Sequence, residues 1–228
     1  MPPKKNNREP GNLLDEAAVE RIFQTLAKTM PGREPGAKGS KEQPDLFRSC
    51  VSCMLSAQSR DENTAKASRQ LFELADTPEG ILGLDDASIV QAIRPAGLYN
   101  MKCKNVKAFC RTVIGEHAGG IPTDRKGLMS LPGIGRKCAD IVLSFALGEA
   151  VIAVDSHVHR VVNRLGLAQG KTEAQSAISL DQRAPQWAKA DGHFWLIQLG
   201  KRICASRAPK CDQCPVSGDC RWYDQISK

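Results

Sequence analysis

The sequence predicts an all-α protein, and three observations lead to this fold class. Apolar residues recur every three or four positions along most of the chain, as on the buried face of a helix. Aspartates, prolines and glycines stand where such helices would begin or end. The period-2 alternation typical of strands is nearly absent from the sequence, and 150–154 is its one β-like stretch.

Apolar spacing predicts six helices in the first half of the chain: about 13–26, 45–54, 61–74, a short helix from Pro78, one from Asp85 or Asp86, and 100–114. Apolar side chains on most faces of 45–54 predict a central position in a core. Asp61 is expected to be the N-cap of its helix, and Pro78 suits a first turn. Residues 1–10 are expected to be disordered, and 30–44, rich in glycine and proline, to be a loop or linker.

Five further helices are predicted after the Gly119-Gly120 break: about 124–130, 136–147, 155–165, 172–182 and 191–204. The apolar residues of 136–147 fall on one face. Gly166 is expected to end the helix before it, because glycine readily adopts the left-handed conformation that closes a helix.

The composition is that of a globular protein with a positive excess. The 228 residues are 41% hydrophobic and 25% charged, with a formal net charge of +7, and the pI is about 9.0. This charge favours polyanionic partners such as nucleic acid, although a solvated surface with a modest excess explains it equally well. No apolar run approaches the ~20 residues of a membrane span, and the start lacks the apolar stretch of a signal peptide. We therefore expect a cytoplasmic protein with no membrane contact and with reduced thiols.

Four cysteines near the C-terminus form the most specific motif. Their spacing is C-x6-C-x2-C-x5-C, and they are Cys204, Cys211, Cys214 and Cys220. Clustered thiolates hold iron–sulfur clusters or zinc, and this spacing differs from the paired C-x2-C layout of zinc ribbons. We expect one [4Fe–4S] cluster bound by all four thiolates, with structural zinc as the alternative. The cluster would fix a loop that presents Arg207 and Lys210 to phosphates.

Three other cysteines are interpreted as packing residues. Cys50 and Cys53 also have C-x2-C spacing, but they lie in an apolar helical run, and cysteine is among the most buried residue types. Cys138 is interpreted as a small helix residue. The alternative is that its place beside Lys137 makes the protein sensitive to oxidation.

Residues 131–137 read Leu-Pro-Gly-Ile-Gly-Arg-Lys between two predicted helices. Gly133 and Gly135 permit a tight turn, which delivers backbone N–H groups at a helix N-terminus, where a phosphate can bind. An ordinary helix–helix turn also uses glycine, but Leu-Pro-Gly-x-Gly followed by Arg136 is a more specific signal. The segment 124–147 is therefore a candidate helix-hairpin-helix, a motif that grips the DNA backbone without reading sequence.

Lys137 and Asp155 are the candidate catalytic residues. A further phosphate contact is the simplest interpretation of Lys137, and a nucleophile is the alternative, because the helix dipole and Arg136 oppose a positive charge on its amine. Asp155 follows an apolar stretch and precedes a helix, so a role as N-cap is sufficient to explain it. Its functional interpretation is a fixed negative charge beside a sugar that develops positive charge at C1′ during glycosidic cleavage.

Three motifs in one order carry a family resemblance. The glycine hairpin at 131–137, Ile-Ala-Val-Asp-Ser-His at 152–157 and the cysteine spacing resemble bacterial endonuclease III. Leu-Ser-Ala-Gln at 55–58 and Gly-Leu-Tyr-Asn at 97–100 are also similar to that family. The likeness extends from about residue 13 to the C-terminus.

The resemblance implies the helix-hairpin-helix DNA glycosylase fold, with two helical domains and a DNA-binding cleft between them. A six-helix barrel would occupy 40–149, and a cluster domain would occupy 150–228. The segment 1–39 would contribute a helix that packs on the cluster domain, followed by the linker.

The resemblance further implies a DNA glycosylase with lyase activity that removes oxidised pyrimidines from duplex DNA in base excision repair. Lys137 would form a Schiff base with the sugar, and Asp155 would be the catalytic carboxylate. Gln58 and Leu98 would fill the gap left by the extruded nucleotide. The alternatives from the residues alone are a helix-end hydrogen bond for Gln58 and core packing for Leu98. Residues implied near the lesion are Ser56, Asp61 and His157.

The sequence departs from the family pattern at several positions. Cys138 and Ser156 stand where threonine is common, and His159 stands where an apolar residue is common. The expected partner is double-stranded DNA with damaged bases or abasic sites, bound by a monomer in the cytoplasm, in association with the nucleoid. Two alternatives are a monofunctional adenine or mismatch glycosylase of the same fold and a non-catalytic DNA-binding module with a structural cluster. Lys137 argues against the first, because the adenine-removing relatives lack this lysine.

Overall fold

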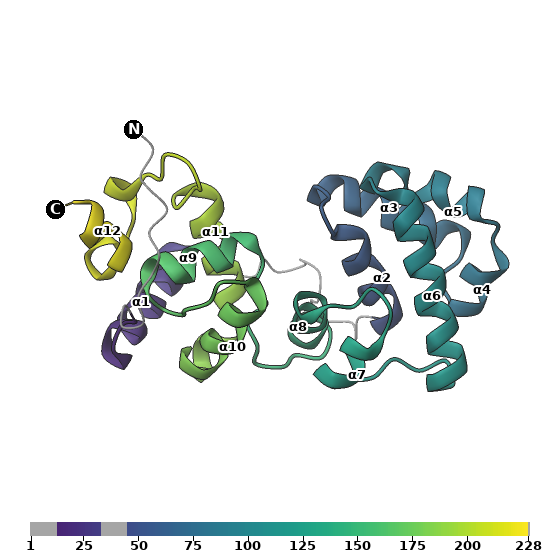
Figure 1. Cartoon of the computed structure of the whole chain (residues 1–228), viewed down its shortest axis with the longest axis horizontal. Coiled ribbons are helices and arrows are strands. Elements are labelled where there is room, and N and C mark those ends of the chain that lie inside the picture. Colours follow the sequence, from purple (N-terminus) through teal and green to yellow (C-terminus); the bar gives the residue numbers. More distant parts are fainter. Residues whose placement is uncertain (1–12, 33–44, 228) are drawn as a thin grey trace. The chain divides into compact units, whose positions relative to one another are not determined.

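The structure is a computed structural model that describes residues 13–32 and 45–227. All regular elements of these residues are helices (Figure 1), so the all-α prediction is confirmed. The chain divides into two compact units: unit 1 combines the described part of Met1–Glu34 with Ala150–Lys228, and unit 2 is the described part of Pro35–Glu149. The predicted disorder of 1–10 and most of the predicted linker at 30–44 lie outside the described residues.

The described part of unit 2 is built from helices around α2. These are α2 (Leu46–Ser56), α3 (Asp61–Leu74), α4 (Pro78–Gly83), α5 (Asp86–Ile93), the 3-10 helix η1 (Arg94–Ala96), α6 (Tyr99–His117), α7 (Arg125–Ser130) and α8 (Arg136–Phe145). α2 packs against α3, α6 and α8, and Phe47 of α2 stacks on Phe109 of α6 with ring centroids 5.8 Å apart. The predicted central position of this apolar segment is confirmed, because Cys50, Val51 and Leu55 have no exposed surface.

Capping side chains fix several helix starts in unit 2. Asp85 Oδ1 accepts the backbone N–H of Ser88 at 2.7 Å and caps α5, and Pro78 stands in the first turn of α4, both as predicted. The prediction that Asp61 is an N-cap is wrong. Arg60 takes that position. Asp61 is the first residue of α3, where its negative charge interacts favourably with the positive end of the helix dipole.

Unit 1 joins the first helix of the chain to the C-terminal half. Its elements are α1 (Glu16–Thr29), α9 (Ser156–Leu165), α10 (Glu173–Arg183), η2 (Gln186–Ala188), α11 (Gly192–Arg202), η3 (Cys211–Gln213), η4 (Ser217–Asp219) and α12 (Arg221–Ile226). α9 packs against α10, α11 and α12, and α1 packs against α11. The buried face of α1, with Ile22, Phe23 and Leu26, shares one apolar core with Val161 of α9 and Leu199 of α11.

The β-like stretch at 150–154 is not a strand in the structure. Ile152 and Val154 are buried in the core of unit 1, and the carbonyl of Ala153 lies 2.8 Å from Nδ1 of His193 on α11. The segment is therefore apolar because it passes through a helical core, and a side chain rather than a neighbouring strand contacts its backbone.

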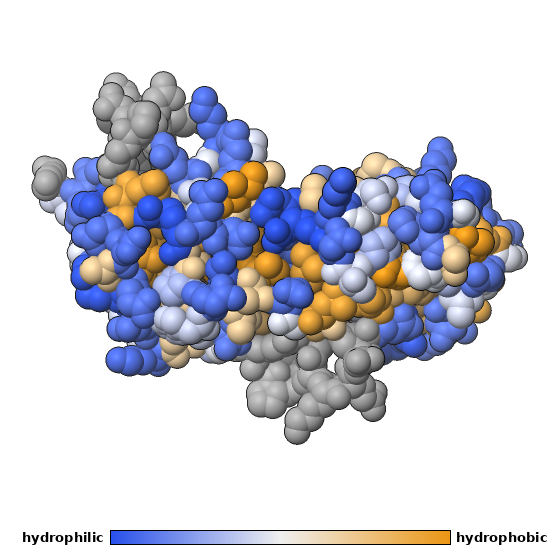
Figure 2. Space-filling view, turned by 90° about the horizontal axis from the view of Figure 1, so that it is seen from below, coloured by the Kyte–Doolittle hydropathy of each residue, from blue (hydrophilic) through white to orange (hydrophobic). Residues whose placement is uncertain are grey.

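One face of the molecule is mainly polar. Figure 2 shows a face of mostly hydrophilic side chains with separate hydrophobic patches. The exposed large apolar side chains include Leu74, Leu98 and Trp187. Single exposed apolar residues are normal on protein surfaces, so only Leu98, at a turn discussed below, bears on function.

Candidate functional site

The hairpin between α7 and α8 is anchored in unit 2 by apolar side chains. Leu131 and Ile134 are only 2% and 4% exposed, so they pin the turn to the core of unit 2. Gly133 between them is exposed and has φ +81°, and a Cβ at this position would lie 2.6 Å from Met54 Cε. Glycine is therefore required at 133 by the left-handed backbone, with the close approach of Met54 as a second reason.

Gly135 serves a different purpose from Gly133. It is the N-cap residue of α8 with φ −87°, so its backbone is accessible to any residue, and a Cβ there would meet no atom within 4 Å. The N-terminus of α8 has no side-chain cap. The first N–H groups of this helix are thus not bonded to a capping side chain, which leaves them available to a phosphate.

Lys137 and Arg136 lie half-buried in the first turn of α8. Arg136 is a candidate DNA-binding residue of the hairpin, and its Nε lies 3.4 Å from Oδ2 of Asp140. The buried Asp140 carboxylate also accepts a 2.7 Å hydrogen bond from Nε of Arg125 on α7. An Arg–Asp–Arg group therefore holds the two helices of the hairpin together, and the sequence pattern had given no sign of it.

Asp155 is the N-cap of α9 in unit 1, as predicted. Its Oδ1 accepts the backbone N–H of Val158 at 2.8 Å, and the side chain is half-buried. The bond fixes the orientation of the carboxylate. Lys137 belongs to unit 2 and Asp155 to unit 1.

His157 follows two residues after Asp155, in the first turn of α9, and is half-buried. Its Nδ1 lies 3.3 Å from Nη2 of Arg160. The same guanidinium donates to the carbonyls of Cys204 and Gly200, each at 2.9 Å. Arg160 thus connects the segment of Asp155 and His157 to the first cysteine of the C-terminal motif. A lone arginine on an amphipathic helix gave no signal for this role.

Gln58 and Leu98 share an uncommon backbone conformation. Gln58, just after α2, has φ +52°, and Leu98, just before α6, has φ +47°. Left-handed conformations are costly for residues other than glycine and concentrate at functional sites. Leu98 is 47% exposed, which excludes the core-packing alternative, and Gln58 is also exposed. Unit 2 therefore exposes one polar side chain, that of Gln58, and one apolar side chain, that of Leu98, each on a left-handed backbone.

Ser56 and Asp61 flank Gln58 in the chain. Ser56 ends α2 half-buried, and its hydroxyl donates to the carbonyl of Cys53 at 2.7 Å. Asp61 is exposed at the start of α3. The structure thus brings Ser56, Gln58 and Asp61 to one turn of unit 2, whereas His157 belongs to unit 1.

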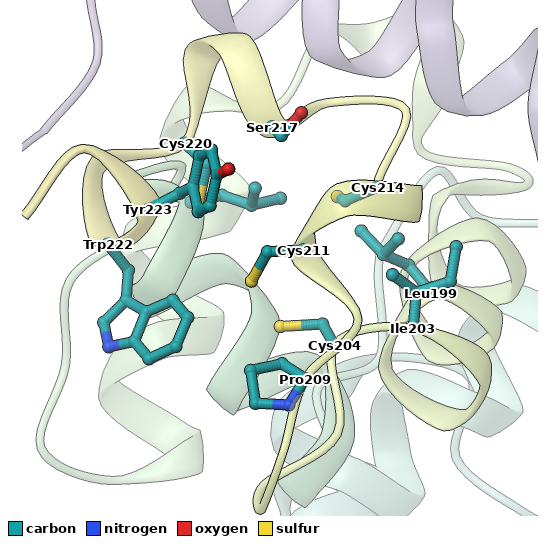
Figure 3. Close-up of a pocket in the computed structure, with 11 residues that line it drawn as sticks. Leu199, Ile203, Cys204, Pro209, Cys211, Cys214, Ser217, Cys220, Trp222 and Tyr223 are labelled. Atoms are coloured by element: carbon teal, nitrogen blue, oxygen red, sulfur yellow. The ribbon is translucent and has the colours of Figure 1, made fainter. Parts of the chain in front are cut away.

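The four C-terminal cysteines line one pocket in unit 1 (Figure 3). Each stands near the end of a short element: Cys204 follows α11, Cys211 opens η3, Cys214 follows η3 and Cys220 precedes α12. The side chains of Cys204 and Cys211 point toward one another in the close-up. About 330 Å³ of empty space, open solvent included, lies among these cysteines and their apolar neighbours, such as Leu199, Ile203 and Trp222.

The donor set, four cysteine side chains around one pocket, is of the kind that binds iron–sulfur clusters or zinc. Among the described residues, no group of three histidine, cysteine or carboxylate side chains is close enough for one metal ion. A single tetrahedral zinc needs four sulfurs about 2.3 Å from one centre, and a [4Fe–4S] cluster is likewise held by four cysteine thiolates. Burial raises the pKa of Cys220 to about 11, so binding of such a group has to displace a proton.

A cation lies against the cysteine pocket. Nη1 of Arg164 is 3.4 Å from Sγ of Cys204, and its guanidinium stacks over the Trp222 ring at 4.5 Å from the centroid. A positive charge there stabilises thiolate ligands. The loop between Cys204 and Cys211 closes through a bond from Lys210 N–H to the carbonyl of Ile203 at 2.9 Å. Arg207 and Lys210 are exposed on this loop.

The remaining cysteines beside the hairpin are protected thiols. Cys50 and Cys138 are buried and Cys53 is half-buried. A hydrogen bond with Cys53 and burial raise the pKa of Cys138 well above its ordinary value, and burial raises that of Cys50 to about 12. Because the thiolate is the reactive form, the structure favours the packing role of Cys138 over sensitivity to oxidation.

Comparisons with known proteins identify the family. The profile of the HhH-GPD superfamily of base excision DNA repair proteins matches residues 51–186. Endonuclease III of Rickettsia conorii is 38% identical over 205 residues, which are 90% of this chain and 96% of that protein. Endonuclease III of Escherichia coli K12 is 38% identical over 180 residues, 79% of this chain and 85% of that protein.

Solved structures agree with the sequence relatives. A non-covalent endonuclease III–DNA complex aligns with a TM-score of 0.83 at 30% identity, covering 94% of this chain and 99% of the other. A trapped covalent endonuclease III–DNA intermediate aligns with a TM-score of 0.82 at 30% identity, covering 95% and 100%. Within the described residues, no helix has the length and apolarity to cross a membrane. The chain belongs to the endonuclease III family within the HhH-GPD superfamily of base excision DNA repair proteins.

Proposed function

We propose that the chain is a bifunctional DNA glycosylase and AP lyase that removes oxidised pyrimidines, such as thymine glycol, from duplex DNA. The observation that carries this proposal is the hairpin of unit 2, where an uncapped helix N-terminus opens beside Lys137. The hairpin binds a backbone phosphate through the N–H groups at Gly135, without reading the base sequence. This contact brings the sugar to the lysine amine.

The chemistry uses Lys137 and Asp155 on one deoxyribose. The unprotonated amine of Lys137 attacks C1′, and the carboxylate of Asp155 offsets the positive charge that develops on the sugar. The base leaves with the glycosidic electron pair. The amine then loses a proton and forms an imine with C1′ as the C1′–O4′ bond breaks and O4′ takes up a proton, which opens the sugar ring. Loss of a proton from C2′ then expels the 3′ phosphate by β-elimination. Because the two residues belong to different units, DNA must engage both units.

Extrusion of the damaged nucleotide is assigned to the two left-handed residues. Gln58 and Leu98 fill the space that the nucleotide leaves in the stack, and their exposure suits this task. Unstacking costs a few kcal/mol, and least for a damaged or poorly stacked base, which gives some selectivity. Ser56, Asp61 and His157 contact the extruded base.

The cysteine pocket is proposed to hold a [4Fe–4S] cluster through Cys204, Cys211, Cys214 and Cys220. When bound, the cluster supplies four iron–thiolate bonds that staple the C-terminal segment. The stapled loop keeps Arg207 and Lys210 exposed for backbone phosphates, a contact that raises affinity for any DNA sequence.

Borohydride trapping tests the proposed reaction. A duplex with one thymine glycol should be nicked, and borohydride should reduce the imine to a stable protein–DNA cross-link. Lys137→Ala should abolish both products while binding to an abasic-site analogue persists. Lys126→Ala, which removes an exposed lysine from α7 of the same hairpin, is the matched control and should still cross-link. A cross-link in Lys137→Ala through another residue of α8 would overturn the assignment.

Product analysis separates the rival functions. A monofunctional glycosylase of this fold would leave an abasic site without a nick, and a DNA-binding module would leave the lesion intact. The lysine at 137 favours the bifunctional enzyme, because only an amine can form the imine. We further propose that it acts as a monomer on chromosomal DNA in the bacterial cytoplasm, in line with its bacterial relatives.

A further inference from the structure

Lys102 is a buried cation in unit 2 that the proposed chemistry does not use. It is the fourth residue of α6 and is 3% exposed. Its Nζ donates to the carbonyl of Leu55 at 2.8 Å and to the carbonyl of Ala96 at 2.9 Å. Lysine is almost never fully buried unless it is paired, because its ammonium loses the hydration of water. Burial lowers the pKa of Lys102, and the two carbonyls provide acceptors in place of water.

The two acceptors belong to the two turns that carry the left-handed residues. Leu55 lies in the last turn of α2, three residues before Gln58, and its carbonyl is at the end of a helix, where carbonyls lack helical partners. Ala96 ends η1, two residues before Leu98. In addition, the backbone N–H of Lys102 donates to the carbonyl of Leu98 at 3.0 Å. One residue is therefore bonded to both turns.

The bonds of Lys102 can hold the strained backbone of Gln58 and Leu98 in place. Gln58 and Leu98 are exposed, so their own side chains make few contacts that would hold φ at +52° and +47°. Strained backbone persists only where the surrounding structure over-determines it. An ammonium with two carbonyl acceptors provides charge-assisted hydrogen bonds, which are shorter and stronger than neutral ones. It also joins turns that are separated by about 40 residues of chain.

We propose that Lys102 is a positioning residue that fixes Gln58 and Leu98 relative to one another before DNA arrives. The inference rests on the proposed function, since it assumes that these two residues fill the space of the extruded nucleotide. If Gln58 and Leu98 are already in place, DNA binding does not have to order them. More of the binding free energy can then offset the cost of unstacking the damaged nucleotide. Lys102 would then matter where a stacked nucleotide must be extruded, and not where the lesion is already unstacked.

The same helix contains a matched control. Lys107 is half-buried, and its Nζ donates to the carbonyl of Leu84 at 2.8 Å and to Oδ1 of Asp86. It therefore ties α6 to the turn between α4 and α5. That turn carries neither Gln58 nor Leu98, so loss of this lysine perturbs the fold of unit 2 without releasing the extruding residues.

The experiment compares Lys102→Met with Lys107→Met on two substrates at a temperature well below each melting point. One substrate is a duplex with a paired thymine glycol, and the other carries the same lesion in a single-nucleotide bulge. In single-turnover base removal, Lys102→Met should be slower on the paired lesion by roughly tenfold or more and within about twofold of wild type on the bulged lesion. Lys107→Met should leave the ratio of the two rates unchanged.

Variants that lack the side chains of Gln58 and Leu98 complete the experiment. In a Gln58→Ala/Leu98→Ala background, Lys102→Met should cause no further change in the paired-to-bulged ratio, because its effect passes through those residues. If Lys102→Met does not fold, Lys102→Gln takes its place. Its side-chain amide still donates N–H hydrogen bonds, so base removal should again be slowed more on the paired than on the bulged lesion, but to a smaller extent. Equal loss on both substrates, as in a merely destabilised enzyme, would overturn the inference. Failure of the proposed function differs, since wild-type protein would then release no base from either substrate.

Discussion

At the scale of single residues, Asp155 combines two roles that substitution can separate. It caps α9 through the bond to Val158, and the proposed mechanism uses its negative charge. Asparagine keeps a capping oxygen without the charge, whereas alanine removes both. We expect Asp155→Asn to slow base removal by about 10²-fold or more at nearly unchanged stability. Asp155→Ala should in addition lower the free energy of unfolding by about 1 kcal/mol.

Single-turnover excision and urea unfolding measure these two effects. Thr172→Ala is the matched control, because Thr172 caps α10 in the same unit by accepting the N–H of Gln175 at 3.2 Å. It should lower stability to a similar extent without slowing excision. Full activity in Asp155→Asn would remove this carboxylate from the mechanism.

Residues differ in how far their sequence context reveals them. The cap at Asp155 followed from an aspartate that precedes a helical pattern, and the structure bears it out. Gln58 and Leu98 were found through the family resemblance, since nothing in the local pattern encodes a left-handed backbone at a non-glycine residue. Lys102 and Arg160 acquire their roles from carbonyls distant in the chain, and a sequence pattern cannot report such partners.

At the scale of elements, the α7–α8 hairpin assigns different tasks to its two glycines. Gly133→Ala should lower the free energy of unfolding by about 1–2 kcal/mol, because φ is +81° there and alanine disfavours the left-handed region. Gly135→Ala should leave stability unchanged, since φ is −87° and a Cβ meets no atom within 4 Å. It should weaken DNA binding instead, because the methyl group occupies the approach of the phosphate to α8.

Thermal unfolding and fluorescence anisotropy with an abasic-analogue duplex check the two glycines. The control is Gly83→Ala, at an exposed end of α4 where a Cβ also meets no atom within 4 Å, and it should change neither quantity by much. If Gly135→Ala binds DNA as tightly as wild type, the uncapped N-terminus of α8 is not the phosphate site.

Amphipathic elements were predictable, and short ones were not. Helices such as α2, α6 and α9 begin and end within a few residues of their predicted limits, because apolar spacing and capping residues mark them. α12 and the 3-10 helices around the cysteines escaped prediction, since segments this short have no periodic face and depend on tertiary contacts. The error at Asp61 is of the same kind, because N-cap and first-turn positions both favour aspartate.

At the scale of the whole molecule, the chain forms two compact units. Unit 1 takes its core from both ends of the sequence, with α1 packed on α11. Local patterns predict the longer amphipathic helices of this unit but not this return of the chain, for which the family resemblance was needed. The cysteine pocket belongs to the same core, since Cys204, Cys214 and Cys220 pack with it.

Removal of the proposed metal centre should therefore act on one unit. Without the proposed iron–thiolate bonds, the segment from Cys204 to Ile226 keeps few regular elements. The three of its four cysteines that pack with the unit 1 core, Cys204, Cys214 and Cys220, then no longer brace that core. Hydrogen exchange should become faster in this segment and in the adjoining ends of α9 and α11. Exchange in α2, α6 and α8 should not change, because those helices have their own core.

Cys214→Ser and Cys110→Ala provide the paired variants for this measurement. Native protein should contain about four irons and four acid-labile sulfides per chain. Cys214→Ser should lose them together with protection in unit 1, whereas Cys110→Ala, at a buried cysteine of unit 2, should keep its iron and lose protection in unit 2 alone. If the native protein instead contained one zinc per chain and no iron, the four cysteines would bind structural zinc and the cluster assignment would be wrong. Unchanged exchange in iron-free protein would show that the apolar contacts of unit 1 suffice to order the loop, and a structural purpose for the four thiolates would then have to be abandoned.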